Sequence, residues 1–180
     1  MTPTEIRPEK RAETRREAET GPPTGTRWLD QEEQVAWRAY LSASQMLADR
    51  LGRELQRDAG LSQADYELLV QLSEAPDRQL RMSILADRTL FSRSRLSHAV
   101  ARLERMGLVT RISCPTDRRG TWASLTDEGF RRLEAAAPCH VTGVRTHLVD
   151  RLTREEFLTL GRLSARVREA LEQVERDRPA

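Results

Sequence analysis

The sequence predicts a mainly α-helical fold in which a helix-turn-helix is followed by a two-stranded β-hairpin. Two observations predict it. Four helix starts share one capping pattern, which divides residues 61–178 into shorter helices and two longer ones. The strand-like segments, residues 109–113 and 121–125, together contain four β-branched side chains, three of them in the first segment, and flank a turn sequence, CPTDRRG, that carries proline and glycine.

Residues 1–27 form a charged segment that is nearly free of large apolar side chains and ends in GPPTGT. Such a segment cannot bury enough surface to offset the entropy lost on ordering, so we expect a disordered arm. Residues 28–180 then form the folded domain. From Trp28 onward apolar residues recur at helical spacing, which predicts one long helix that ends near Gly60.

The four later helix starts place a hydroxyl residue between two apolar residues, one just before it and one four positions after it. The hydroxyl accepts a hydrogen bond from an N–H group of the first turn, and the apolar pair packs across the helix entry. Asp65 and Glu156 stand where a capping box needs a carboxylate. The four capping residues are Ser62, Ser92, Thr126 and Thr153.

Residues 82–89 are predicted to form a short helix that connects tightly, through Leu90 and Phe91, to a second helix over residues 92–106. One face of this second helix is apolar, and the opposite face has neither bulky apolar groups nor carboxylates. Such a face suits the major groove of DNA, although a solvated arginine face would look the same. The residues expected to contact DNA are Ser92, Arg93, Ser94, Arg95, Ser97, His98 and Arg102.

Positive charge is concentrated in the same region. Residues 88–119 contain eight arginines against Glu104 and Asp117, so the segment carries +6 in a chain whose net charge is +2. A basic block in an otherwise acidic chain indicates a polyanionic partner. At the hairpin turn, Arg118 and Arg119 are placed to enter a minor groove beside the helix, with Asp117 orienting one of them.

The run SRSRLSHAVARLERMGLVTRISCPTDRRGTWASLTDEGF, residues 92–130, closely resembles the MarR family of bacterial winged helix-turn-helix regulators. Asp117 and Arg119 match the family's Asp-x-Arg wing pattern. Leu125, Thr126 and Gly129 match the Leu-Thr-x-x-Gly pattern that follows it. The resemblance extends from about residue 30 to about residue 175.

The resemblance implies a homodimer that binds double-stranded DNA at a pseudo-palindromic operator. Residues 61–126 would form the winged helix-turn-helix, and residues 28–60 and 127–178 the dimerisation helices. Family members usually repress transcription, and many are released by a small, often phenolic, ligand held between the dimer helices and the winged domain. Trp37, Tyr40 and Tyr66 are candidate ligand contacts, although such aromatic residues more often belong to a core or a dimer interface.

Other classes of function find less support. The sequence has no apolar run near the ~20 residues needed to span a bilayer and no secretory signal, and its two cysteines indicate a reducing cytoplasm. We expect no enzymatic activity and no cofactor, because no phosphate loop, nucleophile–base pair or metal cage is recognisable. His140 and His147 would lie about 10 Å apart along a helix, too far to share one metal ion with Cys139. Two alternatives remain: a winged-helix module that binds another protein, and a redox-sensing regulator that uses Cys114.

Overall fold

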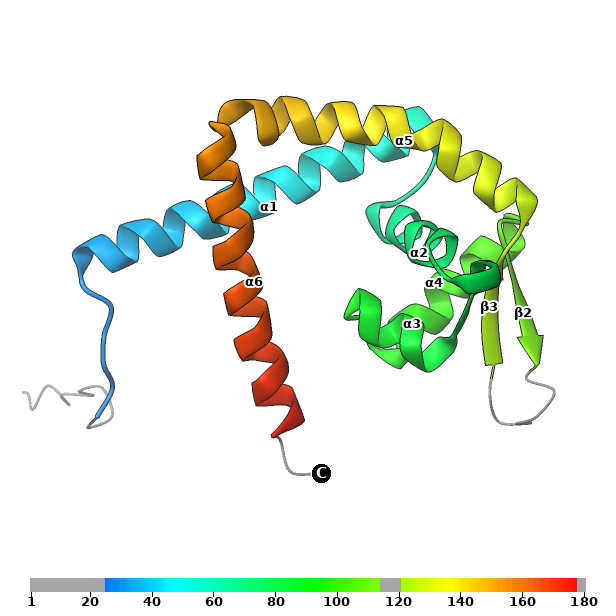
Figure 1. Cartoon of the computed structure of the whole chain (residues 1–180), viewed down its shortest axis with the longest axis horizontal. Coiled ribbons are helices and arrows are strands. Elements are labelled where there is room, and N and C mark those ends of the chain that lie inside the picture. Colours follow the sequence, from blue (N-terminus) through cyan, green and yellow to red (C-terminus); the bar gives the residue numbers. More distant parts are fainter. Residues whose placement is uncertain (1–24, 114–120, 178–180) are drawn as a thin grey trace, which may run out of the picture. The chain divides into compact units, whose positions relative to one another are not determined.

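The computed structural model describes residues 25–113 and 121–177. The chain divides into two units, residues 1–38 and 39–180, and the boundary falls inside the first helix, α1 (Gln31–Ala59) (Figure 1). In the first unit, Asp30 and Glu33 exchange hydrogen bonds between their backbone N–H groups and side-chain carboxylates, which begins α1. Because α1 ends at Ala59, the long helix predicted to end near Gly60 is confirmed.

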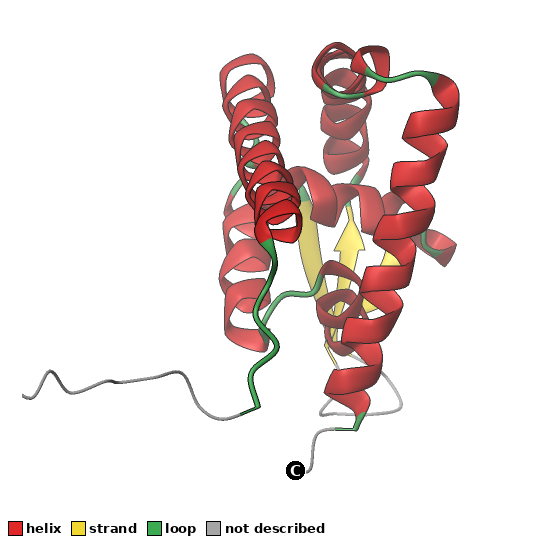
Figure 2. Cartoon of the chain, turned by 90° about the vertical axis from the view of Figure 1, so that its left-hand side faces the viewer, coloured by secondary structure: helices red, strands yellow, loops and turns green. Residues whose placement is uncertain are grey.

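The second unit combines helices with one small sheet, as the sequence predicts (Figure 2). After the last 21 residues of α1 come four helices, α2 (Gln63–Ser73), α3 (Met82–Thr89), α4 (Arg93–Arg105) and α5 (Asp127–His147), and then α6 (Arg154–Arg176). Short 3-10 turns cover Pro76–Arg78 and Val149–Arg151. The strands are β1 (Gln79–Arg81), β2 (Val109–Ser113) and β3 (Thr121–Leu125).

All four predicted helix starts are confirmed. At each one the capping hydroxyl accepts a hydrogen bond from the backbone N–H group three residues later. Asp65 and Glu156 complete capping boxes at the starts of α2 and α6. Gly107 follows α4 with a φ of +73°, a left-handed conformation that favours glycine and ends the helix there.

The sheet differs from the expected two-stranded hairpin by one strand. β2 and β3 have the predicted bounds and pair in antiparallel fashion, with Val109 opposite Leu125. β1, which the sequence did not predict, pairs with the other edge of β3 and places Leu80 opposite Ala123. A strand of three residues is too short to show an alternating pattern, so only tertiary pairing reveals it.

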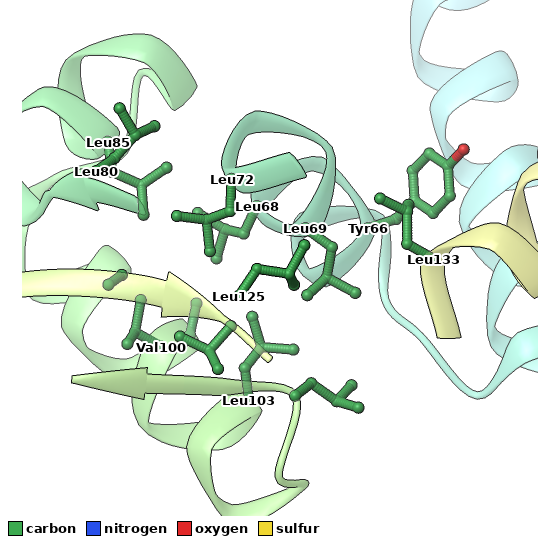
Figure 3. Packing of buried hydrophobic residues seen from close by; sticks show 14 of the residues in the cluster. Tyr66, Leu68, Leu69, Leu72, Leu80, Leu85, Val100, Leu103, Leu125 and Leu133 are labelled. Atoms are coloured by element: carbon green, nitrogen blue, oxygen red, sulfur yellow. The ribbon is translucent and has the colours of Figure 1, made fainter. Parts of the chain in front are cut away.

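A single apolar core holds the helix-turn-helix against the sheet (Figure 3). Leu68, Leu69 and Leu72 of α2 extend toward the sheet, where Leu125 of β3 and Leu103 of α4 meet them. The predicted apolar face of α4 is confirmed, because its four members are all buried. They are Leu96, Ala99, Val100 and Leu103.

The last helix, in contrast, leaves its apolar side chains uncovered. α6 spans 23 residues, and none of its described side chains is buried. Its exposed apolar residues include Leu160, Leu163, Val167, Leu171 and Val174. No helix within residues 25–113 and 121–177 is both long and apolar enough to cross a membrane.

Candidate nucleic-acid interface

The N-terminal half of α4 presents an exposed polar face. Ser92 accepts a hydrogen bond from the backbone N–H group of Arg95 at 3.2 Å, which fixes the first turn. The guanidinium of Arg95 lies 4.1 Å from the centroid of the Phe91 ring, an arrangement typical of a cation–π contact. All six polar residues predicted for this half of the helix are exposed: Ser92, Arg93, Ser94, Arg95, Ser97 and His98.

One acidic group of α2 lies near this basic face. Partial burial raises the pKa of the Glu67 carboxyl, and the positive charge of Arg95 opposes that rise. Arg95 therefore has an aromatic neighbour on its own segment and an anionic neighbour on α2.

Arg102, one of the residues expected to contact DNA, is bound by the carboxylate of Asp65. Its Nε atom donates to both carboxylate oxygens of Asp65, at 3.0 and 3.2 Å, and its Nη2 atom donates to Oδ1 at 2.5 Å. Asp65 is only 3% exposed and also accepts from the hydroxyl and the backbone N–H group of Ser62. Arg102 thus joins α4 to the capped start of α2, which is a reason to remove it from the group of free DNA-facing cations.

Arg111 joins β2 to α4 in a similar way. Its Nη2 atom donates to the carbonyl oxygen of Ser97 at 2.9 Å, and its Nη1 atom lies 3.1 Å from Oε2 of Glu104. The backbone N–H group of Arg111 also donates to Glu104 at 3.1 Å. The root of the hairpin and the exposed helix are therefore held in one orientation relative to each other.

The structure explains why threonine and glycine stand in the Leu-Thr-x-x-Gly segment, residues 125–129. Thr126 donates its backbone N–H group to the carbonyl oxygen of Leu108 and its hydroxyl to that of Gly107, at 3.1 and 2.8 Å. A Cβ atom at Gly129 would overlap the Leu108 carbonyl oxygen and lie 2.7 Å from Cδ1 of Leu125. Only glycine lets α5 start so close to the root of the hairpin.

Two further arginines come from the segment that the sequence analysis left without structure. Arg78 lies over the Phe130 ring at 3.8 Å and also approaches Asp127 at 3.3 Å. Arg81, on β1, lies 5.6 Å from the centroid of the Trp122 ring. The position of Arg81 depends on the pairing of β1 with β3, and that of Arg78 on contacts with α5, so no local sequence signal could have found them. The predicted wing-tip residues Asp117, Arg118 and Arg119 lie outside the described residues.

The aromatic residues proposed as ligand contacts do not share one environment. Tyr66 is buried, and its ring centroid lies 4.4 Å from that of His140 on α5. Trp37, in the first unit, and Tyr40, in the second, are exposed on α1.

His140 also lines a pocket of about 720 Å³ formed by α5, the Val149–Arg151 turn and the start of α6. Burial lowers the pKa of its imidazole, and its Nδ1 atom has no hydrogen-bond partner among the described residues.

Cys139 and His147 of α5 contact separate acidic partners on α1. Cys139 donates to Oδ2 of Asp58 at 3.0 Å, and His147 Nε2 lies 3.0 Å from Oε1 of Glu54. The Asp58 carboxylate raises the pKa of the Cys139 thiol, which disfavours the reactive thiolate. The described part of the chain contains no group of three or more side chains that could hold a metal ion. Cys114 lies outside it.

Comparisons with known proteins agree on one family. A model of the MarR family matches residues 59–120. The chain is 52% identical to Sco3205, a MarR family transcriptional regulator from Streptomyces coelicolor whose structure is in complex with DNA, with a TM-score of 0.79 over 81% of this chain and 92% of that one. AbsC, a MarR family transcriptional regulator from the same organism, is 42% identical, with a TM-score of 0.78 over 82% of this chain and 99% of AbsC. The HTH-type transcriptional regulator MhqR of Bacillus subtilis is 28% identical over 122 residues, which cover 68% of this chain and 79% of MhqR.

Proposed function

Because the chain belongs to the MarR family of DNA-binding transcriptional regulators, we propose that it acts as a homodimer on a pseudo-palindromic operator and represses transcription until a small molecule releases it. A DNA-binding regulator of this family is not an enzyme. Binding to bacterial DNA agrees with the cytoplasmic location expected from the sequence.

The proposal of a dimer rests on the uncovered apolar face of α6. Leu160, Leu163, Val167, Leu171 and Val174 follow one another at spacings of three or four residues, so they share one side of the helix. Their exposed fractions range from 36% to 66%. A continuous apolar stripe of this length marks an interaction surface, and a two-fold axis lets the same stripe of a second copy cover it.

The dimer is tested by light scattering on purified variants. Val167→Glu places a charge on the stripe and is expected to yield monomers. Arg162→Glu adds the same side chain on the opposite side of α6 and is expected to leave a dimer. Truncation after Arg151 removes the whole stripe and should abolish both dimerisation and tight binding to a two-half-site operator. A tightly binding monomer from that truncation would refute the proposal.

We assign DNA contact to the exposed half of α4 and to the tip of the wing. On α4 the contacts are Ser92, Arg93, Ser94, Arg95, Ser97 and His98, and on the wing they are Asp117, Arg118 and Arg119. The helix supplies hydrogen-bonding groups at its N-terminal end, where recognition helices meet base edges. Arg111 supports the assignment, because it holds the wing root in a fixed orientation to that helix.

The DNA site is tested by genome-wide selection of bound fragments, followed by salt titrations on the selected operator. His98→Ala should narrow the difference in affinity between operator and unrelated DNA, because base contacts carry sequence information. Arg119→Ala should weaken both interactions and lower the salt slope by about one ion per site. Asp117→Ala should act in the same direction but less strongly. If all three variants bind as the wild type does at every salt concentration, the assignment is wrong.

Release by a small molecule is supported by the pocket beside His140. Its lining is largely apolar, and the unpartnered Nδ1 atom of His140 offers one polar group to a ligand. A phenol that binds there should raise the melting temperature and lower the affinity for the operator, and operator DNA should weaken phenol binding by the same factor. Contacts by Trp37, Tyr40 and Tyr66 are tested in the same assay with phenylalanine or leucine variants. A redox response through Cys114 predicts instead that peroxide releases the wild type from DNA but not the Cys114→Ser variant.

A further inference from the structure

The turn between α3 and α4 holds an apolar side chain in an unfavourable setting. Leu90 has φ 54° and ψ 30°, the left-handed conformation that glycine or asparagine adopts most readily. Its side chain is 74% exposed, the largest exposed fraction among the large apolar residues that the structure describes. Neither burial nor backbone geometry therefore accounts for a leucine at this position.

The charges around Leu90 are those of a surface that meets a polyanion. Arg88 precedes it by two residues and Arg93 follows it by three, and both are exposed. One carboxylate, that of Asp87, lies in the same turn. Most other strongly exposed apolar residues of the second unit lie on α1, α5 and α6.

Leu90 also lies at the end of α4 to which the proposed function assigns contact with DNA. It lies two residues before Ser92, the residue that caps α4, and recognition helices meet base edges with their N-terminal residues. DNA offers apolar surface in two forms, the methyl group of thymine in the major groove and the faces of the deoxyribose rings.

We propose that Leu90 packs against apolar surface of the operator and contributes to its selection. This inference rests on the proposed function as a DNA-binding regulator. An apolar contact with DNA accounts for a leucine that is strained and exposed in the free protein, because the contact exists only in the complex.

The test uses two substitutions that suit the left-handed backbone, Leu90→Gly and Leu90→Asn. Their melting temperatures should equal or exceed that of the wild type, because little apolar surface is lost and backbone strain is relieved. Their affinity for the selected operator should fall about tenfold, the lower end of the cost of one lost base contact. Asp77→Gly is the matched control. It relieves a φ of 52° in a different turn and should not weaken DNA binding.

A second operator, with deoxyuridine in place of thymidine, separates the two sources of apolar surface. If the wild type binds this operator less tightly and Leu90→Gly does not distinguish the two operators, the contact is with a thymine methyl group. If the wild type binds both operators equally and Leu90→Gly still loses affinity, the contact is with deoxyribose.

Two results would overturn the inference. One is that Leu90→Gly and Leu90→Asn bind the operator as tightly as the wild type. The other is that both variants unfold at clearly lower temperatures, which would give Leu90 a structural role. A wild-type protein that prefers no DNA fragment at all would instead refute the proposed function itself.

Discussion

Replacing Arg102 with alanine should lower the stability of the fold but leave the discrimination between operator and unrelated DNA unchanged. In the wild type the guanidinium makes three contacts with the Asp65 carboxylate between 2.5 and 3.2 Å. The carboxylate side chain is 4% exposed, so its removal from water is nearly complete. After the substitution Asp65 retains only its hydrogen bonds from Ser62, and a buried charge is left without its partner.

The size of the effect follows from the exposure of the two partners. Breaking a fully buried ion pair costs about 3–5 kcal/mol. The Arg102 side chain is 42% exposed, so solvent screens the pair and a loss of about 1.5–3 kcal/mol is expected. For a domain of this size that loss lowers the melting temperature by about 4–10 °C.

Thermal unfolding followed by circular dichroism measures this loss. Arg105→Ala is the matched control, because it removes an exposed arginine from the same helix and should leave the melting temperature nearly unchanged. The double variant Asp65→Asn with Arg102→Ala removes the unpaired charge and should recover part of the stability. Measured at a temperature where the protein is folded, Arg102→Ala should keep its discrimination between operator and unrelated DNA. An unchanged melting temperature together with lost discrimination would show that Arg102 reads bases and that the ion pair is incidental.

Three further substitutions test other features of the structure. In a denaturant titration, Gly129→Ala should lower the free energy of unfolding by about 2–4 kcal/mol, because a Cβ atom there meets the Leu108 backbone. Gly161→Ala, where a Cβ atom has open space, should be neutral or stabilising in the same titration. Burial lowers the pKa of His140, so below pH 6.5 the unfolded chain binds more protons than the folded chain and the stability of the fold decreases. The melting temperature of His140→Phe should therefore fall less than that of the wild type between pH 7.5 and 5.5. Arg111→Ala should weaken operator binding while costing only about 1 kcal/mol of stability, and equal affinity in a binding titration would show that the wing root needs no such anchor.

The elements that the sequence could predict are those with local causes. The starts of α2, α4, α5 and α6 follow from hydroxyl caps and nearby apolar residues, all within five positions of one another. The bounds of β2 and β3 follow from strand-forming residues, β-branched ones above all in β2, on either side of a turn sequence. The burial of Leu96, Ala99, Val100 and Leu103 follows from helical periodicity alone.

The features that escaped prediction depend on contacts between distant residues. β1 exists because Gln79–Arg81 reach the free edge of β3, more than forty positions away. The partner of Arg102 is 37 residues distant, and a helical wheel of α4 contains no information about α2. The capping pattern indicates that Asp65 accepts hydrogen bonds at the start of α2. A carboxylate can accept more hydrogen bonds than a cap requires, and Asp65 accepts the additional ones from Arg102.

The uncovered state of α6 has a consequence for how the protein can be studied. A helix of 23 residues gains most of its stability from the packing of one face, and the capping box at Thr153 and Glu156 supports only its first turn. If a second copy covers that face, the helical content of α6 depends on protein concentration. Ellipticity at 222 nm should therefore decrease on dilution in step with dissociation, which provides an assay of assembly that needs no label, no DNA and no ligand.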